Sequence, residues 1–158
     1  MTHTEEFVKE MYLKIDIHSP QQLRFSTLAE RLHIDTFYWP ETSQALFMND
    51  KGFVFLNERL TPQQQWQEFC HELAHVLLHT GNQRRMPESF RVYQEAKANT
   101  FMYHAAVPTF MLDQLNLFDF EITGVYEVQK RFNVEYDFAL KRLLQYISNK
   151  NSMLNRNI

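Results

Sequence analysis

The feature that most constrains this chain is a long helix with marked ends, predicted over residues 61–81. Thr61 is a favourable N-cap, Pro62 suits the first helical turn, and Gln64 completes a capping box. Gly81 stands where helices commonly end in a left-handed residue. One face is an apolar stripe, formed by Trp66, Phe69, Cys70, Leu73 and Leu77. Such a helix has to pack this stripe against a core.

The opposite face of the same helix carries ionisable residues, namely Glu68, His71, Glu72, His75 and His79. Residues 71–75 read His-Glu-Leu-Ala-His. Because positions i and i+4 share a helix face, His71 and His75 can place two ring nitrogens on one metal ion. Glu72 is offset by one residue and falls beside that ion, where a carboxylate can accept a proton from water. The spacing therefore predicts a metal site with Glu72 as its general base.

A catalytic zinc site usually takes a third protein ligand, and the best candidate lies on the next predicted helix, over residues 90–106. On that helix, the face of Glu95 also carries Ala98 and Ala106, whose small side chains let two helices approach closely. Asn99, one turn after Glu95, could accept a hydrogen bond from a ligating histidine and set its tautomer. We therefore predict Glu95 as the third ligand and Asn99 as a supporting hydrogen-bond partner.

The rest of the pattern predicts a mixed α+β chain. Two helices, at 4–14 and 25–32, precede three short runs rich in aromatic and branched residues, at 34–39, 45–48 and 53–56. The last two runs are separated by Asn-Asp-Lys-Gly, a turn sequence, so a small antiparallel sheet is expected. After the metal-binding helix pair, further helices are expected at 108–117, 124–132 and 135–147, followed by a polar tail.

Composition favours one domain. A chain of 158 residues with 44% hydrophobic residues can bury a sizeable core. We expect a single unit made of N-terminal helices (1–33), a small sheet (34–60), a metal-binding helix pair (61–107) and a C-terminal helical region (108–158). The net charge of −3 gives no general electrostatic reason to expect nucleic acid or a membrane as the main partner.

The sequence also predicts where the protein acts. Its one cysteine, Cys70, excludes an intrachain disulfide, fits a reducing cytosol and is expected to be a buried thiol. The first 14 residues are rich in charge, which is unlike a signal peptide, and no apolar run approaches membrane length. We therefore expect a cytoplasmic location.

The two helix motifs resemble a known family. HELAHVLLH at 71–79, followed by EAKANTFMYHAAVP at 95–108, is similar to the zinc peptidases of the ImmA/IrrE type. Their pattern is roughly HELGHLLLH, then E-x-x-A-N-x-F-A, then a short apolar run and proline. The match is good over 61–108 and weaker outside. The resemblance implies a gluzincin-like minimal metallopeptidase, in which a small twisted sheet packs on the active-site helix.

Carried over residue by residue, the resemblance implies one zinc ion held by His71, His75 and Glu95, with Glu72 as general base. It also implies a substrate class, DNA-binding repressors of the helix-turn-helix kind, which are cut or inactivated to induce genes of phages or mobile elements. Ala74 replaces the usual glycine of the family, and residues 104–107 replace a bulkier apolar run. Neither departure touches a proposed ligand. We expect the substrate to bind extended, by adding to an edge of the small sheet.

Some of these residues keep a second interpretation. The two histidines could belong to an ordinary solvated helix face, and Glu95 could pair with a neighbouring cation at the surface. His79 could support the metal site, but a helix-end histidine interacting with the helix dipole is the preferred interpretation. Tyr93 or Tyr103 could donate to the oxyanion of a tetrahedral intermediate, although most tyrosines are core or interface residues. His104 lies nearly opposite Glu95 on its helix, which favours packing or surface exposure.

Two other classes of function stay open. The same fold could be a non-catalytic regulator that binds a repressor or transcription factor, with the metal structural, sensory or absent. Separately, residues 125–143 resemble a helix-turn-helix, and DNA contact would then involve Lys141 and Arg142. The second helix of that segment begins with Glu135 and Asp137, where a DNA reader prefers neutral or basic residues. Helix packing is therefore the preferred interpretation of this segment.

Overall fold

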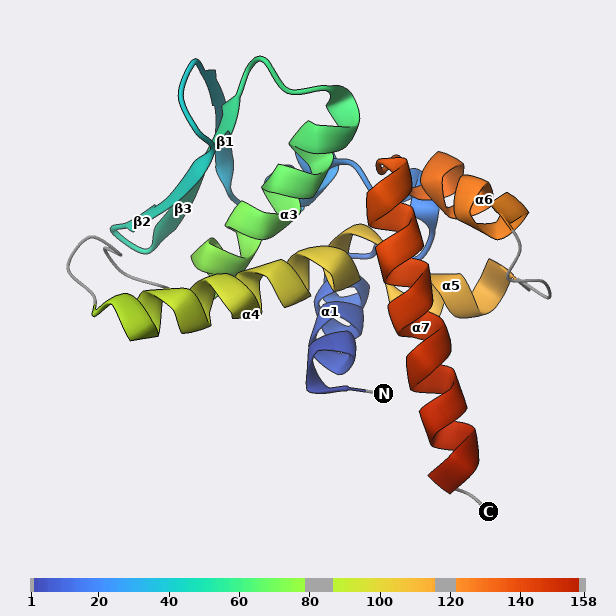
Figure 1. Ribbon diagram of the computed structural model, residues 1–158. Coiled ribbons are helices and arrows are strands. Elements are labelled where there is room, and N and C mark those ends of the chain that lie inside the picture. Colours follow the sequence, from blue (N-terminus) through green and yellow to red (C-terminus); the bar gives the residue numbers. More distant parts are fainter. Residues whose placement is uncertain (1, 79–86, 116–121, 157–158) are drawn as a thin grey trace.

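The computed structural model of the protein describes residues 2–78, 87–115 and 122–156. A small sheet lies on one side of a larger helical body (Figure 1). The strands are β1 (Asp35–Trp39), β2 (Gln44–Met48) and β3 (Lys51–Asn57). The helices are α1 (His3–Lys14), α2 (Phe25–Arg31), α3 (Pro62–Leu77), α4 (Glu88–Ala106), α5 (Thr109–Leu112), α6 (Ile122–Phe132) and α7 (Tyr136–Arg156), with short 3-10 turns at Pro20–Gln22 and Asp113–Leu115. The predicted α+β class is confirmed.

The sheet has the strand order β1-β3-β2. β2 and β3 form the expected antiparallel hairpin, and the two residues at its tip, Asn49 and Asp50, both have positive φ, at 50° and 61°. This conformation matches the twist of a tight hairpin and suits these two residue types. β1 pairs with β3 in parallel, so the sheet as a whole is mixed. The turn sequence predicted the hairpin, while the parallel pairing of β1 had no local signal.

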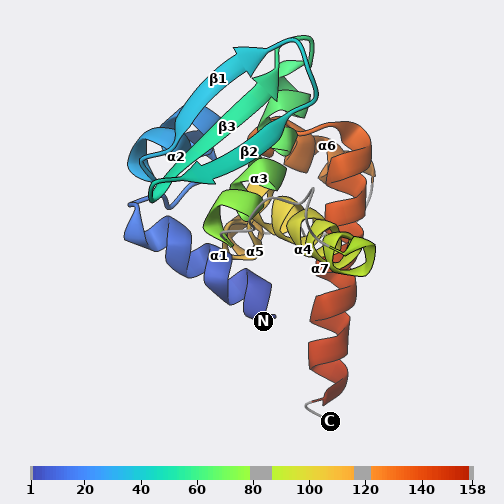
Figure 2. The same cartoon turned by 90° about the vertical axis from the view of Figure 1, so that its left-hand side faces the viewer.

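Helix α3 lies between the sheet and α4, and Figure 2 shows it behind the strands. Its predicted start is confirmed, because the Thr61 hydroxyl accepts from the backbone N–H of Gln64 at 3.2 Å and the Gln64 side chain accepts from that of Thr61 at 3.1 Å. The apolar stripe is buried, apart from the half-buried Leu77. The helix ends at Leu77, and Gly81 lies outside the described residues.

The C-terminal region is helical, as predicted, but its last helix is longer than expected. α7 runs to Arg156, whereas the sequence predicted a polar tail after residue 147. The extension is held to the body by Lys150, whose ammonium lies 2.7 Å from Asp113 Oδ1. α5 and the following 3-10 turn cover 109–115 of the predicted helix at 108–117, and the last two residues of that prediction lie outside the described part.

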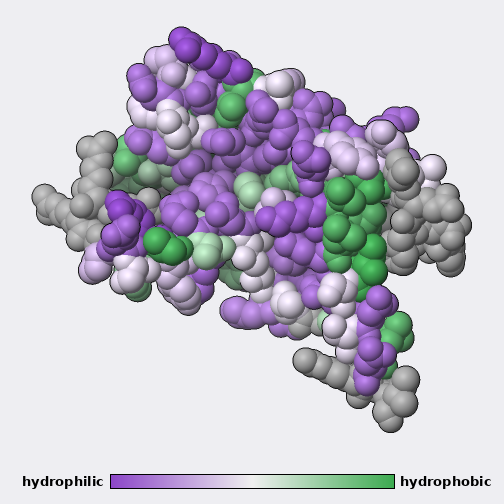
Figure 3. All heavy atoms as spheres, in the orientation of Figure 1, coloured by the Kyte–Doolittle hydropathy of each residue, from purple (hydrophilic) through white to green (hydrophobic). Residues whose placement is uncertain are grey.

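The surface on the side of α7 is mixed. Hydrophobic side chains gather along one flank of this helix, while most of the rest of the same view is hydrophilic (Figure 3). Among the described helices, none is long and apolar enough to cross a bilayer.

Candidate metal centre

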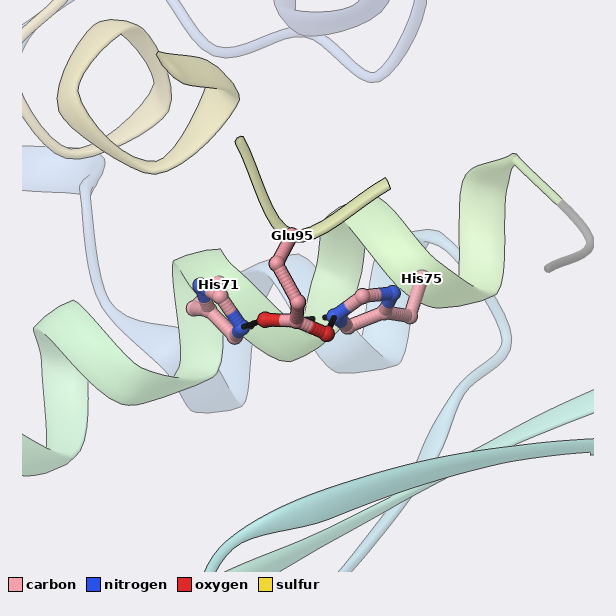
Figure 4. A group of neighbouring side chains, drawn as sticks. All are labelled: His71, His75 and Glu95. Carbon is pink, nitrogen blue, oxygen red and sulfur yellow. Dashed lines mark hydrogen bonds and ion pairs between the residues drawn. The ribbon is translucent and has the colours of Figure 1, made fainter. Parts of the chain in front are cut away.

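Two neighbouring helices bring the three predicted ligands together. His71 and His75 lie one turn apart on α3, and Glu95 projects from α4 between them (Figure 4). The two Nε2 atoms are 3.3 Å apart. The Glu95 carboxylate spans the pair, with Oε2 at 3.1 Å from His71 Nε2 and Oε1 at 3.2 Å from His75 Nε2. The sequence predicted that these three side chains come together, and in the structure their ligand atoms lie next to one another.

Small residues allow this approach of the two helices. Ala74 on α3 and Ala98 on α4 are both fully buried. A larger side chain at either position would hold the helix axes apart, because packed helices are separated by what lies between them. With the helices this close, the Glu95 side chain is long enough to bring its carboxylate to the imidazole rings. The two alanines are therefore part of how the fold builds the site.

The three side chains fit a divalent ion such as zinc. Zinc bonds to imidazole nitrogen and carboxylate oxygen are about 2.0–2.2 Å long, so tetrahedral ligands lie about 3.3–3.6 Å from one another. The three observed separations, 3.1, 3.2 and 3.3 Å, are close to this tetrahedral edge. Two histidines and one glutamate also form a known donor set of catalytic zinc, which leaves a fourth position for water or substrate.

Solvent reaches the candidate centre from one side. The side chain of His75 is 9% exposed, that of His71 is 19% exposed, and that of Glu95 is 39% exposed. Burial lowers the pKa of His75, with the nearby His71 acting in the same direction and the Glu95 carboxylate acting against it. The lowered pKa favours the neutral imidazole, which is the form that can donate a lone pair to a metal. Because Glu95 is the most exposed of the three side chains, a ligand can reach the centre from the side of this carboxylate.

Glu72 is buried beside the ligands, with only 7% of its surface exposed. Burial raises the pKa of its carboxyl to about 8, and the negative charges of Glu68 and Glu95 add to this shift. A hydrogen bond from the backbone N–H of Ala45 on β2 acts in the opposite direction. A divalent cation nearby also lowers the pKa of such a carboxyl. The protonation of Glu72 is thus set by its surroundings, as expected of a proton-transfer group.

The contact with Ala45 was not predicted. It joins the edge strand β2 to the candidate base through a backbone N–H. Almost every residue type has this group, so the sequence does not show which residue makes the contact. The solvated helix face considered from the sequence is also incorrect for Glu72 and His75, because α4 and the sheet cover them. On the ionisable face of α3, Glu72 and His75 are therefore buried, while Glu68 and His71 are partly exposed.

The other predicted site residues lie further out. Asn99 is exposed, and no hydrogen bond joins it to a histidine within the described part of the chain. Tyr93 is 54% exposed and has the ammonium of Lys97 4.8 Å from its ring centre. The ring of Tyr103 stacks on Phe138, with centroids 4.4 Å apart. The supporting role of Asn99 and the oxyanion roles of the tyrosines stay predictions, and His79 lies outside the described residues.

The helix-turn-helix-like segment is built into the fold. The backbone N–H of Glu135 donates to Gln67 Oε1 at 2.7 Å, and the Glu135 carboxylate accepts from Gln64 at 2.9 Å and from Gln67 at 3.1 Å. Arg142 is fully buried and donates to the carbonyl of Val107 at 3.0 Å. The start of α7 is therefore attached to α3, which agrees with the preferred interpretation of helix packing. The alternative, a DNA contact that includes Arg142, is wrong because this side chain is fully buried.

Comparison with known proteins agrees with this site. Residues 29–144 match the peptidase family described as the IrrE N-terminal-like domain. The chain is 37% identical over 143 residues to the Phage-like element PBSX protein XkdA of Bacillus subtilis (strain 168), covering 90% of this chain and 72% of that protein. It is 35% identical over 145 residues to the Uncharacterized protein YqaB of the same strain, covering 92% and 84%.

A solved structure shows the same fold. The chain superposes on a Mycobacterium tuberculosis transcriptional regulator with a TM-score of 0.61 and 16% sequence identity, over 88% of this chain and 46% of that one. This protein therefore spans about half the length of that regulator. The family match covers most of the chain, and two relatives exceed 30% identity over nine-tenths of it. This chain thus belongs to the IrrE N-terminal-like domain family of peptidases, as its ImmA/IrrE-like motifs predicted.

Proposed function

We propose that this protein is a zinc-dependent endopeptidase that cleaves a DNA-binding repressor and thereby induces genes of a phage or mobile element. The observation that carries the proposal is the convergence of His71, His75 and Glu95 at separations of 3.1–3.3 Å, next to the buried carboxyl of Glu72. Membership of a peptidase family and similarity to a phage-element protein support the hydrolytic and regulatory parts. The gluzincin-like arrangement belongs to the same proposal.

Each residue has one task in the proposed reaction. His71, His75 and Glu95 would hold the ion, which would supply Lewis acidity for the scissile carbonyl and for the attacking water. Glu72 accepts the proton of that water and later donates it to the leaving amine, so a single carboxyl serves as base and then as acid. Burial of Glu72 keeps its proton exchange directed at the reacting atoms rather than at bulk water.

The substrate backbone is proposed to pair with β2. This strand is at the edge of the sheet, lies against α3, and points the backbone N–H of Ala45 at Glu72. An extended peptide added along β2 would therefore pass beside the general base, and its main-chain hydrogen bonds would hold it there without regard to its side chains. Selection among proteins then depends on the rest of the partner. In this proposal the protein binds the repressor directly, in the cytoplasm, and the two proteins need not be bound to the same DNA.

The test combines metal content with cleavage of a candidate repressor. The purified chain is analysed for metals, then incubated with the helix-turn-helix repressor encoded nearest its gene, and new termini are sought by intact-mass measurement. The matched variant is Glu72→Gln, which keeps the shape of the side chain and the three ligands. We expect it to retain the metal and to lose cleavage by at least about 100-fold, the usual contribution of a general base.

The outcomes separate the candidate functions. A Glu72→Gln variant that cleaves at the normal rate would remove Glu72 from the mechanism. Binding of the repressor without new termini, by a protein that contains its metal, would favour the non-catalytic regulator over the peptidase.

A further inference from the structure

A cavity of about 460 Å³ lies where three segments far apart in the chain meet. One wall comes from the 3-10 turn at Pro20–Gln22 and the start of α2, the second from the first turn of α3, and the third from the end of α6. We call it the α3-start cavity. Cavities of this size hold small organic molecules, so the chemistry of the walls decides which kind of molecule fits.

Positive charge prevails on the walls of this cavity. Arg24 and Arg131 line it, and no Asp or Glu is among its lining residues. Arg131 donates through Nε to Glu127, which offsets its charge in part. Among the described residues, no carboxylate forms an ion pair with Arg24. A guanidinium group binds phosphate or carboxylate through two parallel hydrogen bonds, so an oxyanion is the partner that these two side chains favour.

The wall formed by α3 also holds a buried donor. Trp66 lines the cavity and is only 2% exposed. In the described part of the chain, its indole N–H has no hydrogen-bond partner. Buried polar groups nearly always have a partner, and an indole N–H can only donate. An oxygen acceptor carried by an occupant of the cavity would supply the missing partner.

The α3-start cavity is separate from the metal centre. Pro62, Gln65 and Trp66 face the cavity, whereas His71 and His75 lie on the side of α3 that meets Glu95 of α4 (Figure 4). With 3.6 residues per turn, these two faces of α3 are close to half a turn apart. Trp66 also precedes His71 by five residues, or about 7.5 Å along the helix axis. A small molecule in the cavity therefore cannot be the one that meets the metal.

We propose that the α3-start cavity is a binding site for a small organic anion, whose phosphate or carboxylate group pairs with Arg24 and Arg131 and accepts from the indole N–H of Trp66. The uncharged part of this ligand lies against the apolar part of the wall, which includes Leu23 and Phe25. Such a ligand holds α2, α3 and α6 together without touching the metal ligands, so it acts as an effector and not as a substrate. The proposal does not depend on the proposed hydrolysis.

The test uses Trp66 as its own reporter. The chain has two tryptophans, and the other one, Trp39 on β1, does not line the cavity. In the full chain carrying Trp39→Phe, the NMR spectrum of nitrogen-labelled protein should therefore contain one indole N–H signal. Two anions are titrated, adenosine monophosphate for a phosphate group and benzoate for a carboxylate. The controls are adenosine, sodium chloride at matched ionic strength and a glutamate-rich peptide.

We expect at least one of the two anions to move the Trp66 indole signal in a saturable titration and to raise the melting temperature by about 5 °C at saturation. Adenosine and sodium chloride should do neither, because they lack the organic oxyanion. The anion that binds identifies the preferred group, phosphate or carboxylate. A signal that neither anion moves would overturn the proposal. A signal that only the acidic peptide moves would also overturn it and would assign the cavity to a partner protein.

Charge variants show where the anion binds. Arg24→Gln removes one guanidinium from the wall and should weaken binding at least about 10-fold. Arg24 is exposed, so this variant should fold normally, which circular dichroism checks. The matched control is Lys130→Gln, which removes the same charge from an exposed position of α6 outside the cavity and should leave the affinity unchanged. Full affinity in Arg24→Gln, or an equal loss in both variants, would overturn the proposal, because the anion would then bind elsewhere or through net charge alone.

Discussion

Glu95 is the ligand on which the candidate centre depends most, because it alone comes from a second helix. His71 and His75 share α3, and their relative position follows from helix geometry. Glu95 closes the site only while α4 packs on α3, and its two oxygens bind one histidine each, at 3.1 and 3.2 Å. The third ligand thus couples metal binding to the tertiary structure.

Replacement of Glu95 by glutamine should therefore abolish tight metal binding. The amide has nearly the same size as the carboxylate but carries no negative charge. The two histidines bind a metal as neutral imidazoles, so Glu95 supplies the negative charge of the site. We expect a loss of zinc affinity of at least about 100-fold, measured by competition with a coloured chelator. Glu88→Gln, an exposed change at the start of α4, is the control and should bind normally. Unchanged affinity in Glu95→Gln would place the metal elsewhere.

His104 should make stability depend on pH. Burial lowers its pKa from 6.5 to about 4, and the positive Arg142 adds to the shift while Glu5 acts against it. Its Nδ1 is 4.0 Å from Glu5 Oε1, which is too far for a hydrogen bond. The folded protein therefore holds a neutral imidazole. Because the unfolded chain takes up the proton first, stability is fully present above pH 6.5 and falls as the pH decreases toward 4.

The variant His104→Gln should flatten that pH dependence. For the wild type, urea unfolding should show a loss of up to about 3 kcal/mol between pH 6.5 and 4, from the 2.5-unit shift. The comparison is best made above pH 4.5. The pKa of Glu5 is lowered from 4.5 in the folded protein, so below pH 4.5 the protonation of Glu5 also reduces stability. His3→Gln, at an exposed position, should keep the slope. An equal slope in His104→Gln would contradict the assignment.

At the scale of elements, the approach of β3 to α3 depends on Gly52. A Cβ at this position would overlap Val76 Cγ1, and Val76 follows the ligand His75 directly. The glycine is needed for space and not for backbone freedom, since no described glycine has positive φ. The strand can therefore lie close enough for the neighbouring β2 to reach Glu72.

Gly52→Ala should destabilise the protein by about 1–3 kcal/mol, the usual cost of overpacking. The second variant, Val76→Ala, removes the clashing methyl, so the double variant should be less destabilised than the sum of the two single changes. Chemical denaturation of all four proteins measures this coupling. Additive losses would show that the methyl of residue 52 does not meet Val76.

At the scale of the whole molecule, a buried polar chain joins the first and last helices. Arg142 on α7 donates to Thr109 Oγ1 at 2.7 Å, and the Thr109 hydroxyl donates to Glu5 Oε1 on α1 at 2.7 Å. Arg142 also donates to the carbonyl of Val107 at 3.0 Å. Arg142 is 0% exposed and Glu5 is 4% exposed, so neither charge has bulk water to replace its partner.

Arg142→Met should cost about 3–5 kcal/mol in the free energy of unfolding, because it leaves the Glu5 carboxylate buried without its cation. Adding Glu5→Gln removes that charge, so the double variant should recover part of the loss. Arg131→Met, which breaks only the exposed pair with Glu127, is the control and should cost less than about 1 kcal/mol. A loss as small as that of the control would show that the buried chain is not needed.

Much of the site could be predicted from local sequence. The capping box, the i, i+4 histidines and the small residues around Glu95 are short-range patterns, and each was found where expected. The predicted length of the last helix was wrong because residues 148–156 lack an obvious core pattern, while Lys150 holds them through a contact with Asp113. A DNA contact by Arg142 stayed open as the less favoured alternative to helix packing, because nothing local distinguishes a buried arginine from an exposed one.

By itself, the sequence determined which side chains could bind a metal and which helices carry them, since helical periodicity and capping act over a few residues. Only the tertiary structure decided that Glu72 and His75 on α3 are buried, that β1 runs parallel to β3, and that a backbone N–H of β2 reaches Glu72. These features depend on packing between segments far apart in the chain, and packing depends on shape and volume that no short pattern of residues contains.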